Sequence, residues 1–481
     1  MEAEDASVAA VITDVKRILW GDQINEELFL RWSQGFIFSP DESTALVQRE
    51  GGPCAVIAPV QAFIVRALMK DLEFFSTNSW RHMPSERVDS YLCQALTEIL
   101  RQVANSDSAP VETPPSTSAK LKLIQDQQQQ SDPAASLTPQ SPPVPPPSTY
   151  CIVFLNEPLS RRISCESEVA DVPQDNRPHR TEEEIFHRNL RLLKLDNINQ
   201  VESVLKEKLE SFKGHYGVLQ FLYSAILTKG VSRLSHDMSE ASELIDPVHG
   251  HGGQSLINLF LSGQGVNYVF DNDKYLGGLE LKGIARQCEV GFLTVLERLR
   301  YCEVGSFLKN PKYPIWLLGS ETHLTVLFSW DMNLVKPESS AGQALRVFKT
   351  YDPDGNNFIQ TVVLDDVMRT AGLFADTEYV EIMTKKLDPE NLGIVLMNDF
   401  MDEFFQNENY GGPDTFTVFH YNGLPRGSSS TNKVVYNEGN AIILETDLRC
   451  LSDENMLLTC LQTKWPNIDV QWLSGSTPSI N

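Results

Sequence analysis

The feature that most constrains this chain is a segment that is apolar on nearly every side. It covers residues 55–69 and follows directly on Gly51-Gly52-Pro53-Cys54. A helix that is apolar all round has no face for solvent and must therefore lie inside a domain. The sequence thus predicts a buried helix with Cys54 at its start.

The remaining patterns predict a mixture of helices and strands. Leu30, Trp32, Phe36 and Phe38 alternate with period two, so residues 30–38 are predicted as strand-like. Residues 314–319 and 323–329 are predicted to form a hairpin with its turn near Ser320-Glu321-Thr322. Further predictions are helices at 7–20, 216–227 and 254–261 and strands at 151–155 and 415–421. These elements indicate the α+β class.

Changes in composition predict three regions. Residues 105–148 hold proline pairs, a glutamine tract and a polyproline run, so they cannot bury enough apolar surface to fold and are predicted to be a disordered insert. Residues 341–408 behave as a unit of their own. We therefore expect one main domain, formed by residues 1–340 with the insert interrupting it and completed by residues 409–481, and a paired-loop unit at 341–408 between these two parts.

The 341–408 unit contains two twelve-residue loops of the kind found in EF-hands. The first starts at Asp352, has oxygen ligands at its odd positions, and ends in Val363 where a bidentate carboxylate belongs. The second starts at Asp388 and ends in Asp399, but it has Leu392 at position five. Each loop has thus lost one usual ligand. The pattern predicts EF-hand-like packing without a calcium site, and no cofactor or metal is assigned to the chain.

Charge and cysteine usage narrow the partners and the compartment. With 40 Lys and Arg against 64 Asp and Glu, the net charge of −24 repels phosphate, so nucleic acid and anionic membrane are poor partners. The N-terminus is acidic where a signal peptide is basic. Eight scattered cysteines form no C-x-x-C pair, which indicates reduced thiols and a location in nucleus and cytoplasm.

Three residues are candidates for thiol catalysis. Cys54 at a helix start is favoured as thiolate, His323 can serve as its base, and the amide of Gln48 can donate to an oxyanion. Each also has a structural alternative: an inert core cysteine, a hydrogen-bonded histidine at a strand start, and a surface amide. Two histidines at 249 and 251 suggest a metal site, but Asp246 is the only other plausible ligand nearby, so a hydrogen-bonded loop is the better account.

Two segments of this chain resemble the MINDY family of deubiquitinating cysteine proteases. One is Gln48-Arg49-Glu50-Gly51-Gly52-Pro53-Cys54, and the other is Glu321-Thr322-His323-Leu324-Thr325-Val326 after an Ile-Trp strand. Residues 246–259 and Gln462-Thr463-Lys464-Trp465-Pro466 also resemble the third member of that family. The resemblance spans most of the chain outside 105–148.

The resemblance implies a papain-like fold and hydrolysis of isopeptide bonds in polyubiquitin, with lysine-48-linked chains as substrate. It implies that Cys54 is the nucleophile, His323 the base and Gln48 the oxyanion donor, and that polyubiquitin and ubiquitinated proteins are the partners. For the group that orients the imidazole, Asn422 and His420 stay open. Two other functions also stay open: a catalytically silent EF-hand-like adaptor and a Cys–His acyl transferase. Oligomeric state is not predicted.

Overall fold

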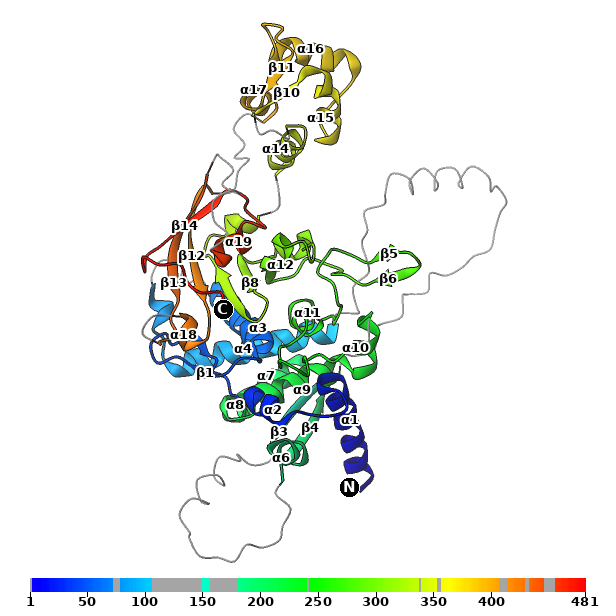
Figure 1. Ribbon diagram of the computed structural model, residues 1–481, viewed down its shortest axis with the longest axis vertical. Helices are drawn as coiled ribbons and strands as arrows, with labels where there is room; N and C mark the ends of the chain where they lie inside the picture. The colour runs from blue at the N-terminus through cyan, green and yellow to red at the C-terminus, as the bar shows by residue number, and fades with distance from the viewer. Residues whose placement is uncertain are drawn as a thin grey trace, which may run out of the picture.

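The computed structural model describes residues 2–71, 78–105, 149–155, 180–239, 242–336, 339–352, 356–405, 413–428, 432–444 and 455–481 (Figure 1). Helices and a sheet occupy separate parts of the molecule, as in the α+β class. Residues 106–148, which make up nearly all of the predicted insert, lie outside the described residues, and Asn105 is the last residue of a helix.

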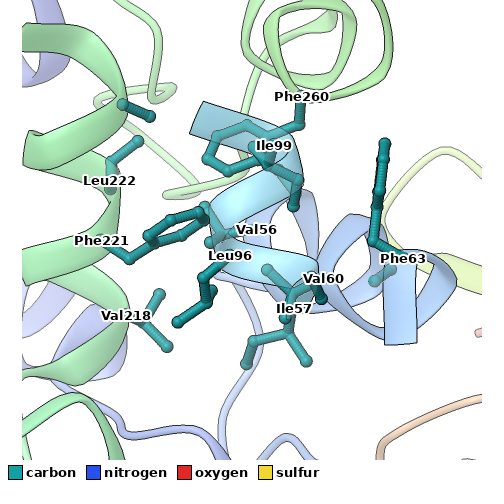
Figure 2. Packing of buried hydrophobic residues seen from close by; sticks show 14 of the residues in the cluster. Val56, Ile57, Val60, Phe63, Leu96, Ile99, Val218, Phe221, Leu222 and Phe260 are labelled. Atoms are coloured by element: carbon teal, nitrogen blue, oxygen red, sulfur yellow. The ribbon is translucent and has the colours of Figure 1, made fainter. Parts of the chain in front are cut away.

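The apolar segment after Cys54 forms the predicted buried helix. Helix α3 (Cys54–Lys70) has every residue buried from Cys54 to Met69. It packs against α4 (Ser85–Asn105), α9 (Gly217–Lys229) and α11 (Gln254–Ser262). Figure 2 shows Val56 and Val60 of α3 facing Leu96 of α4 and Phe221 of α9. Burying an aliphatic side chain of this size contributes about 1.5–3 kcal/mol, so the interior of this helical layer is a major source of stability.

A six-stranded sheet covers the other side of α3. Its strand order is β14 (Ile468–Trp472), β13 (Asn437–Ile443), β12 (Thr415–Tyr421), β9 (Leu324–Phe328), β8 (Ile315–Gly319) and β7 (Gly291–Thr294). All neighbours are antiparallel except β7 and β8. Strands β8 and β9 form the predicted hairpin, with Gly319 opposite Leu324, and α3 lies against both. Residue 323 comes just before β9 and residue 422 just after β12, so the pairing of these two strands brings both residues to the same end of the sheet, close to the start of α3.

The strand prediction for residues 30–38 was wrong. Residues 26–32 form helix α2 (Glu26–Trp32), and only β1 (Ile37–Phe38) is extended. The side chain of Asn25 caps α2 by accepting from the backbone N–H of Glu27 at 2.9 Å, and two acidic residues occupy the first turn. Such an N-terminus stabilises a short helix. Trp32 on α2 and Phe36 in the segment between α2 and β1 are buried in the same core, which produces an apolar alternation without a strand.

The other helices predicted above are confirmed, with small shifts at their ends. The first is α1 (Glu2–Trp20), and the strand predicted at 151–155 is β3 (Tyr150–Leu155), paired with β4 (Leu190–Leu195). Additional elements are β2 (Leu46–Val47), α6 (Glu182–Asn189), α7 (Ile198–Glu207), α8 (Leu209–Lys213), α10 (Val231–Asp237), β5 (Lys274–Leu276), β6 (Leu279–Leu281), α12 (Val295–Arg298), α13 (Ser306–Lys309), α18 (Pro425–Ser428) and α19 (Met456–Leu461). None of the helices in these described segments has the length and apolar character needed to cross a bilayer.

Residues 341–405 enclose a hydrophobic core of their own. It is built from α14 (Ser340–Thr350), α15 (Leu364–Thr370), α16 (Thr377–Leu387) and α17 (Met397–Phe404), and these helices stand apart from the sheet in Figure 1. Strands β10 (Phe358–Gln360) and β11 (Ile394–Leu396) join the two loops, with Ile359 opposite Val395 as the loop positions predict. Pro353, Asp354 and Gly355 of the first loop lie outside the described residues.

Candidate active site

Cys54 is the first residue of α3, where the backbone amides of a helix lack internal partners. Its side chain is 4% exposed, and Sγ donates to the carbonyl oxygen of Gly52 at 3.7 Å. The backbone N–H groups of Leu324 and Ala55 act on the sulfur as hydrogen-bond donors. The sulfur of Cys54 therefore lies between the N-terminus of α3 and Leu324, the first residue of β9, which directly follows His323 in the chain.

Burial dominates the acidity of this thiol. It raises the pKa of Cys54 to about 11, and the backbone donors of Leu324 and Ala55 offset only part of that rise. The nucleophile of a thiol enzyme is the thiolate, and a thiol with this pKa is almost wholly protonated at neutral pH. A base is therefore needed to take the proton as the sulfur attacks.

His323 lies just before β9 and is 6% exposed. Its ring Nε2 is 3.0 Å from the backbone oxygen of Asn422 and 3.2 Å from Oδ1 of the same residue. Because both partners are oxygens, Nε2 carries the proton and donates to them, which leaves Nδ1 as the nitrogen that can accept a proton. Burial lowers the pKa of His323, and the two bonds to Asn422 oppose this effect. A buried neutral imidazole with a defined tautomer is suited to general-base work.

Gln48 reaches the same region from the other side. Its backbone N–H donates to the oxygen of Gly423 at 2.9 Å, and its side-chain Nε2 donates to the backbone oxygen of Glu50 at 2.9 Å. The side chain is buried, with 1% exposed. A primary amide carries two N–H groups, so the second remains for a substrate oxygen. The arrangement suits an oxyanion donor.

The structure brings the three predicted residues to one place. Gln48 and His323 both contact the turn at 422–423, while Cys54 contacts the amide of Leu324 beside His323. Their catalytic roles stay predictions.

The group that orients the imidazole is distinguished by its contacts. Asn422 bonds the ring of His323, whereas Nε2 of His420 bonds Oγ1 of Thr325 at 3.0 Å. His420 is fully buried, which lowers its pKa to about 3 and keeps it neutral. From the sequence, Asn422 could be recognised only as the residue that follows the strand 415–421. Its place opposite His323 results from the pairing of β12 with β9, which no local pattern shows.

Two side chains at the end of α2 hold the loop before Cys54, and the strand prediction for 30–38 could not have placed them. Arg31 donates from Nε to the oxygen of Gly51 at 3.0 Å and from Nη2 to the oxygen of His249 at 2.9 Å. Trp32 donates from Nε1 to the oxygen of Gly250 at 2.9 Å. These bonds tie the loop before Cys54 to residues 246–253.

The loop at 246–253 is organised by hydrogen bonds. Oδ1 of Asp246 accepts from the backbone N–H groups of Val248 and His249. The rings of His249 and His251 stack 6.1 Å apart, and the electrostatic interaction with His251 adds to the burial that lowers the pKa of His323. No group of three metal-ligating side chains occurs among the residues that the structure describes.

Gly52 allows the loop before Cys54 to pass close to Gly250 and Trp32. Its φ is +121°, and a Cβ there would lie 3.0 Å from the oxygen of Gly250 and 3.0 Å from Nε1 of Trp32. Gly52→Ala should therefore lower the free energy of unfolding by about 1–3 kcal/mol and displace Cys54. The measurements are urea unfolding and the reaction rate of the Cys54 thiol. Gly51→Ala is the matched control, since its nearest neighbour is Nη2 of Arg31 at 3.9 Å, and equal losses in both variants would contradict the account.

Comparison with known proteins places this site in a family. Residues 16–137 and 162–356 match the conserved domain described as "Deubiquitinating enzyme MINDY-3/4". This match includes Gln48, Cys54 and His323, and it ends before Asn422. No solved structure matches the chain.

Similar proteins cover nearly the whole chain. A Drosophila melanogaster "Ubiquitin carboxyl-terminal hydrolase MINDY-3 homolog" is 42% identical over 98% of this chain and 83% of its own length. The Xenopus tropicalis MINDY-3 is 41% identical over 96% of this chain and 98% of its own, and the Homo sapiens MINDY-3 is 40% identical over 97% and 99%. With a domain match over most of the chain and this identity over nearly its full length, the chain belongs to the MINDY-3/4 family of deubiquitinating enzymes.

Proposed function

We propose that this protein is a deubiquitinating cysteine protease that hydrolyses isopeptide bonds in polyubiquitin, with Cys54 as nucleophile. Its substrates are polyubiquitin chains and ubiquitinated proteins. Relatives at about 40% identity over nearly their full length carry the name ubiquitin carboxyl-terminal hydrolase, which supports the reaction class.

The observation that carries the proposal is the arrangement around His323. Asn422 accepts from Nε2 at 3.0 and 3.2 Å, so Nδ1 is the basic nitrogen. The next residue, Leu324, donates its backbone N–H to the sulfur of Cys54 at the start of α3. A thiol, a base with a defined tautomer and a buried amide donor have little use together in a binding module, and this favours catalysis over the adaptor reading.

In the first half of the reaction, Sγ of Cys54 attacks the carbonyl carbon of the C-terminal glycine of ubiquitin. The thiol proton passes to Nδ1 of His323, which compensates for the high pKa that burial gives the thiol. Negative charge develops on the carbonyl oxygen. The free N–H of Gln48 Nε2 and the backbone amides at the start of α3 stabilise that charge.

In the second half, the imidazolium of His323 gives its proton to the lysine amine as the C–N bond breaks. The products at this point are a free amine and a thioester between ubiquitin and Cys54. Water then attacks the thioester carbon with His323 as base, which releases the carboxylate of ubiquitin and restores the thiol. An acyl transferase would share every step except the last, in which another nucleophile would replace water.

A ubiquitin probe with a C-terminal electrophile tests the proposal. The probe should add the mass of one ubiquitin, and peptide mapping should place the adduct on Cys54. Ubiquitin lacking its last two glycines, fused to the same electrophile, is the control and should react far more slowly. Labelling of another cysteine, or no labelling of the folded protein, would contradict the proposal.

We further propose lysine-48-linked chains as the preferred substrate, on the resemblance of the segments around Cys54 and His323. The supporting test is a panel of the eight chain types at equal concentration, followed in time. Cleavage of lysine-48-linked tetraubiquitin at least tenfold faster than the other types would support the preference. Equal rates across the panel would remove it and leave the hydrolase proposal intact.

We propose a papain-like arrangement for the catalytic part and EF-hand-like packing for residues 341–405. The first is supported by a nucleophile at a helix start with its histidine and asparagine on neighbouring sheet strands. The second is supported by the helix–loop–helix order and by the pairing of Ile359 with Val395. Free thiols at the six described cysteines suit the nucleus and cytoplasm.

The EF-hand-like loops are expected to act without calcium. The carboxylate of Asp352 accepts backbone N–H groups from Asn356 at 3.0 Å and Asn357 at 2.7 Å, and Asp388 does the same with Leu392 at 2.8 Å and Gly393 at 2.7 Å. These bonds close both loops by protein contacts alone. The residues do not fit a complete site, because Val363 and Leu392 supply no side-chain oxygen.

Chain cleavage should therefore run at the same rate in about 1 mM calcium, a concentration that saturates sensor-type loops, and in excess chelator. Calorimetry with calcium is expected to show no heat beyond dilution. A double change that completes the loops, Val363→Glu with Leu392→Asp, is the positive control and should gain measurable affinity. Micromolar binding by the natural protein, or cleavage that depends on calcium, would contradict this expectation.

A further inference from the structure

The side-chain amide of Asn422 is oriented by residues from the end of the described chain. Its Nδ2 donates to the backbone oxygen of Ser479 at 2.8 Å and to that of Asn481 at 3.4 Å. Its Oδ1 accepts the backbone N–H of Leu424 at 3.1 Å and faces Nε2 of His323 at 3.2 Å. Both ends of the amide are thus occupied, and the two backbone oxygens, together with the N–H of Leu424, select which end faces the imidazole.

This selection matters because an asparagine amide is nearly symmetric in shape. Turning it by about 180° exchanges oxygen and nitrogen at little steric cost. A turned amide would place the NH2 group of Asn422 against the Nε2–H of His323, so two donors would face each other. The ring would then lose one of its two acceptors and move from the position in which Nδ1 is available to the thiol.

The residues that supply the carbonyls are anchored to the body of the protein. Ile480 is 2% exposed and belongs to the hydrophobic cluster of the sheet and α19. Nδ2 of Asn455, at the start of α19, lies 3.3 Å from Oγ1 of Thr477, and Nδ2 of Asn481 lies 3.8 Å from Sδ of Met456. The segment can therefore hold Asn422 in place.

We infer that residues 479–481 are a positioning element of the active site, which fixes the amide of Asn422 and through it the ring of His323. The inference rests on the proposed function of His323 as base. None of these residues touches the substrate carbonyl; they act through Asn422. Changes in the 479–481 segment, including binding of another molecule to it, would then alter turnover without altering substrate binding.

Deletion of residues 479–481 is the first test. With the carbonyls removed, kcat should fall on the order of 10²-fold, the effect expected of a misplaced catalytic group, while KM stays within about twofold. Ser476→Ala is the matched control, since Ser476 is exposed, lies just before the segment and is not among the residues bonded to Asn422, and it should keep at least about half of the activity. Thermal melts of every variant monitor folding.

The decisive comparison uses Asn422→Asp in both backgrounds. In the full chain a carboxylate at 422 faces the two carbonyl oxygens of Ser479 and Asn481, so kcat should fall at least fivefold. In the deletion background those carbonyls are gone, and a carboxylate presents oxygen to His323 in either orientation. There the same change should raise kcat at least fivefold. A purely structural role for the segment would not reverse the sign.

Two further measurements separate this inference from the proposed function. Imidazole ¹⁵N shifts of His323 report the tautomer without ubiquitin, and the fraction of the Nε2–H form should fall on deletion and recover with Asn422→Asp. If the deletion melts too early, Ile480→Ser loosens the segment instead and should give the same reversal. An effect of Asn422→Asp in the same direction in both backgrounds, or an unchanged tautomer, would overturn the inference. Absence of ubiquitin cleavage by the natural chain would instead overturn the proposed function.

Discussion

Replacing Cys54 by alanine is expected to abolish chain cleavage while leaving the protein folded. The sulfur is the only atom that forms the covalent bond, so its removal should cost at least about 10⁴-fold in kcat. The structural cost is small, because the bonds of Sγ to the oxygen of Gly52 and from the backbone N–H groups of Leu324 and Ala55 are weak sulfur bonds, and alanine suits the start of a helix. We expect a loss of about 1 kcal/mol in the free energy of unfolding.

The experiment follows cleavage of tetraubiquitin together with a thermal melt. Cys93→Ala is the matched control, since Cys93 is also buried, lies on α4, and has its thiol pKa raised by burial to about 11. It should cost similar stability and retain activity. Persistent probe labelling of Cys54→Ala, or cleavage within tenfold of the natural rate, would assign the chemistry to another residue.

Removal of the base is expected to have the next largest effect. In His323→Ala nothing takes the proton of a thiol whose pKa is raised by burial to about 11, so kcat should fall at least about 10³-fold. Gln48→Ala removes one oxyanion donor and should cost about 10²–10³-fold, leaving measurable activity. Raising the pH should partly rescue His323→Ala, because hydroxide then supplies the thiolate, and it should not rescue Gln48→Ala.

These variants need controls for burial, since both side chains lie inside the protein. His323→Gln keeps a polar group beside Asn422 and should be as inactive as His323→Ala with a smaller loss of stability. His236→Ala, an exposed change on α10, should leave cleavage unchanged. The mechanism above would fail if His323→Ala and Gln48→Ala both kept rates close to that of the natural chain.

Local patterns predicted the central elements well because those elements are determined by which side chains avoid water. The run after Cys54 is apolar on all sides, and it forms α3 with no exposed face. A hairpin forms between residues 315–319 and 324–328, because the connection between them is too short to join the two strands in any other way. The strand prediction for residues 30–38 failed, since Trp32 reaches the core from helix α2 and Phe36 from the segment after it, while Leu30 is 43% exposed. The capping signal of Asn25 with its acidic first turn was present and outweighed the period-two pattern.

What the sequence determined by itself is the chemistry available: a thiol at a helix start, an amide shortly before it and an imidazole at a strand start. Each of these can be read from its own few neighbours in the chain, because helix and strand starts are local features. Only the tertiary structure decided that Asn422, and not His420, bonds His323, because that choice follows from the pairing of β12 with β9 across about a hundred residues. It also decided that the thiol is buried, with its pKa raised to about 11, and that residues 479–481 orient Asn422. Burial and long-range contacts are sums over many distant residues, and no local pattern carries them.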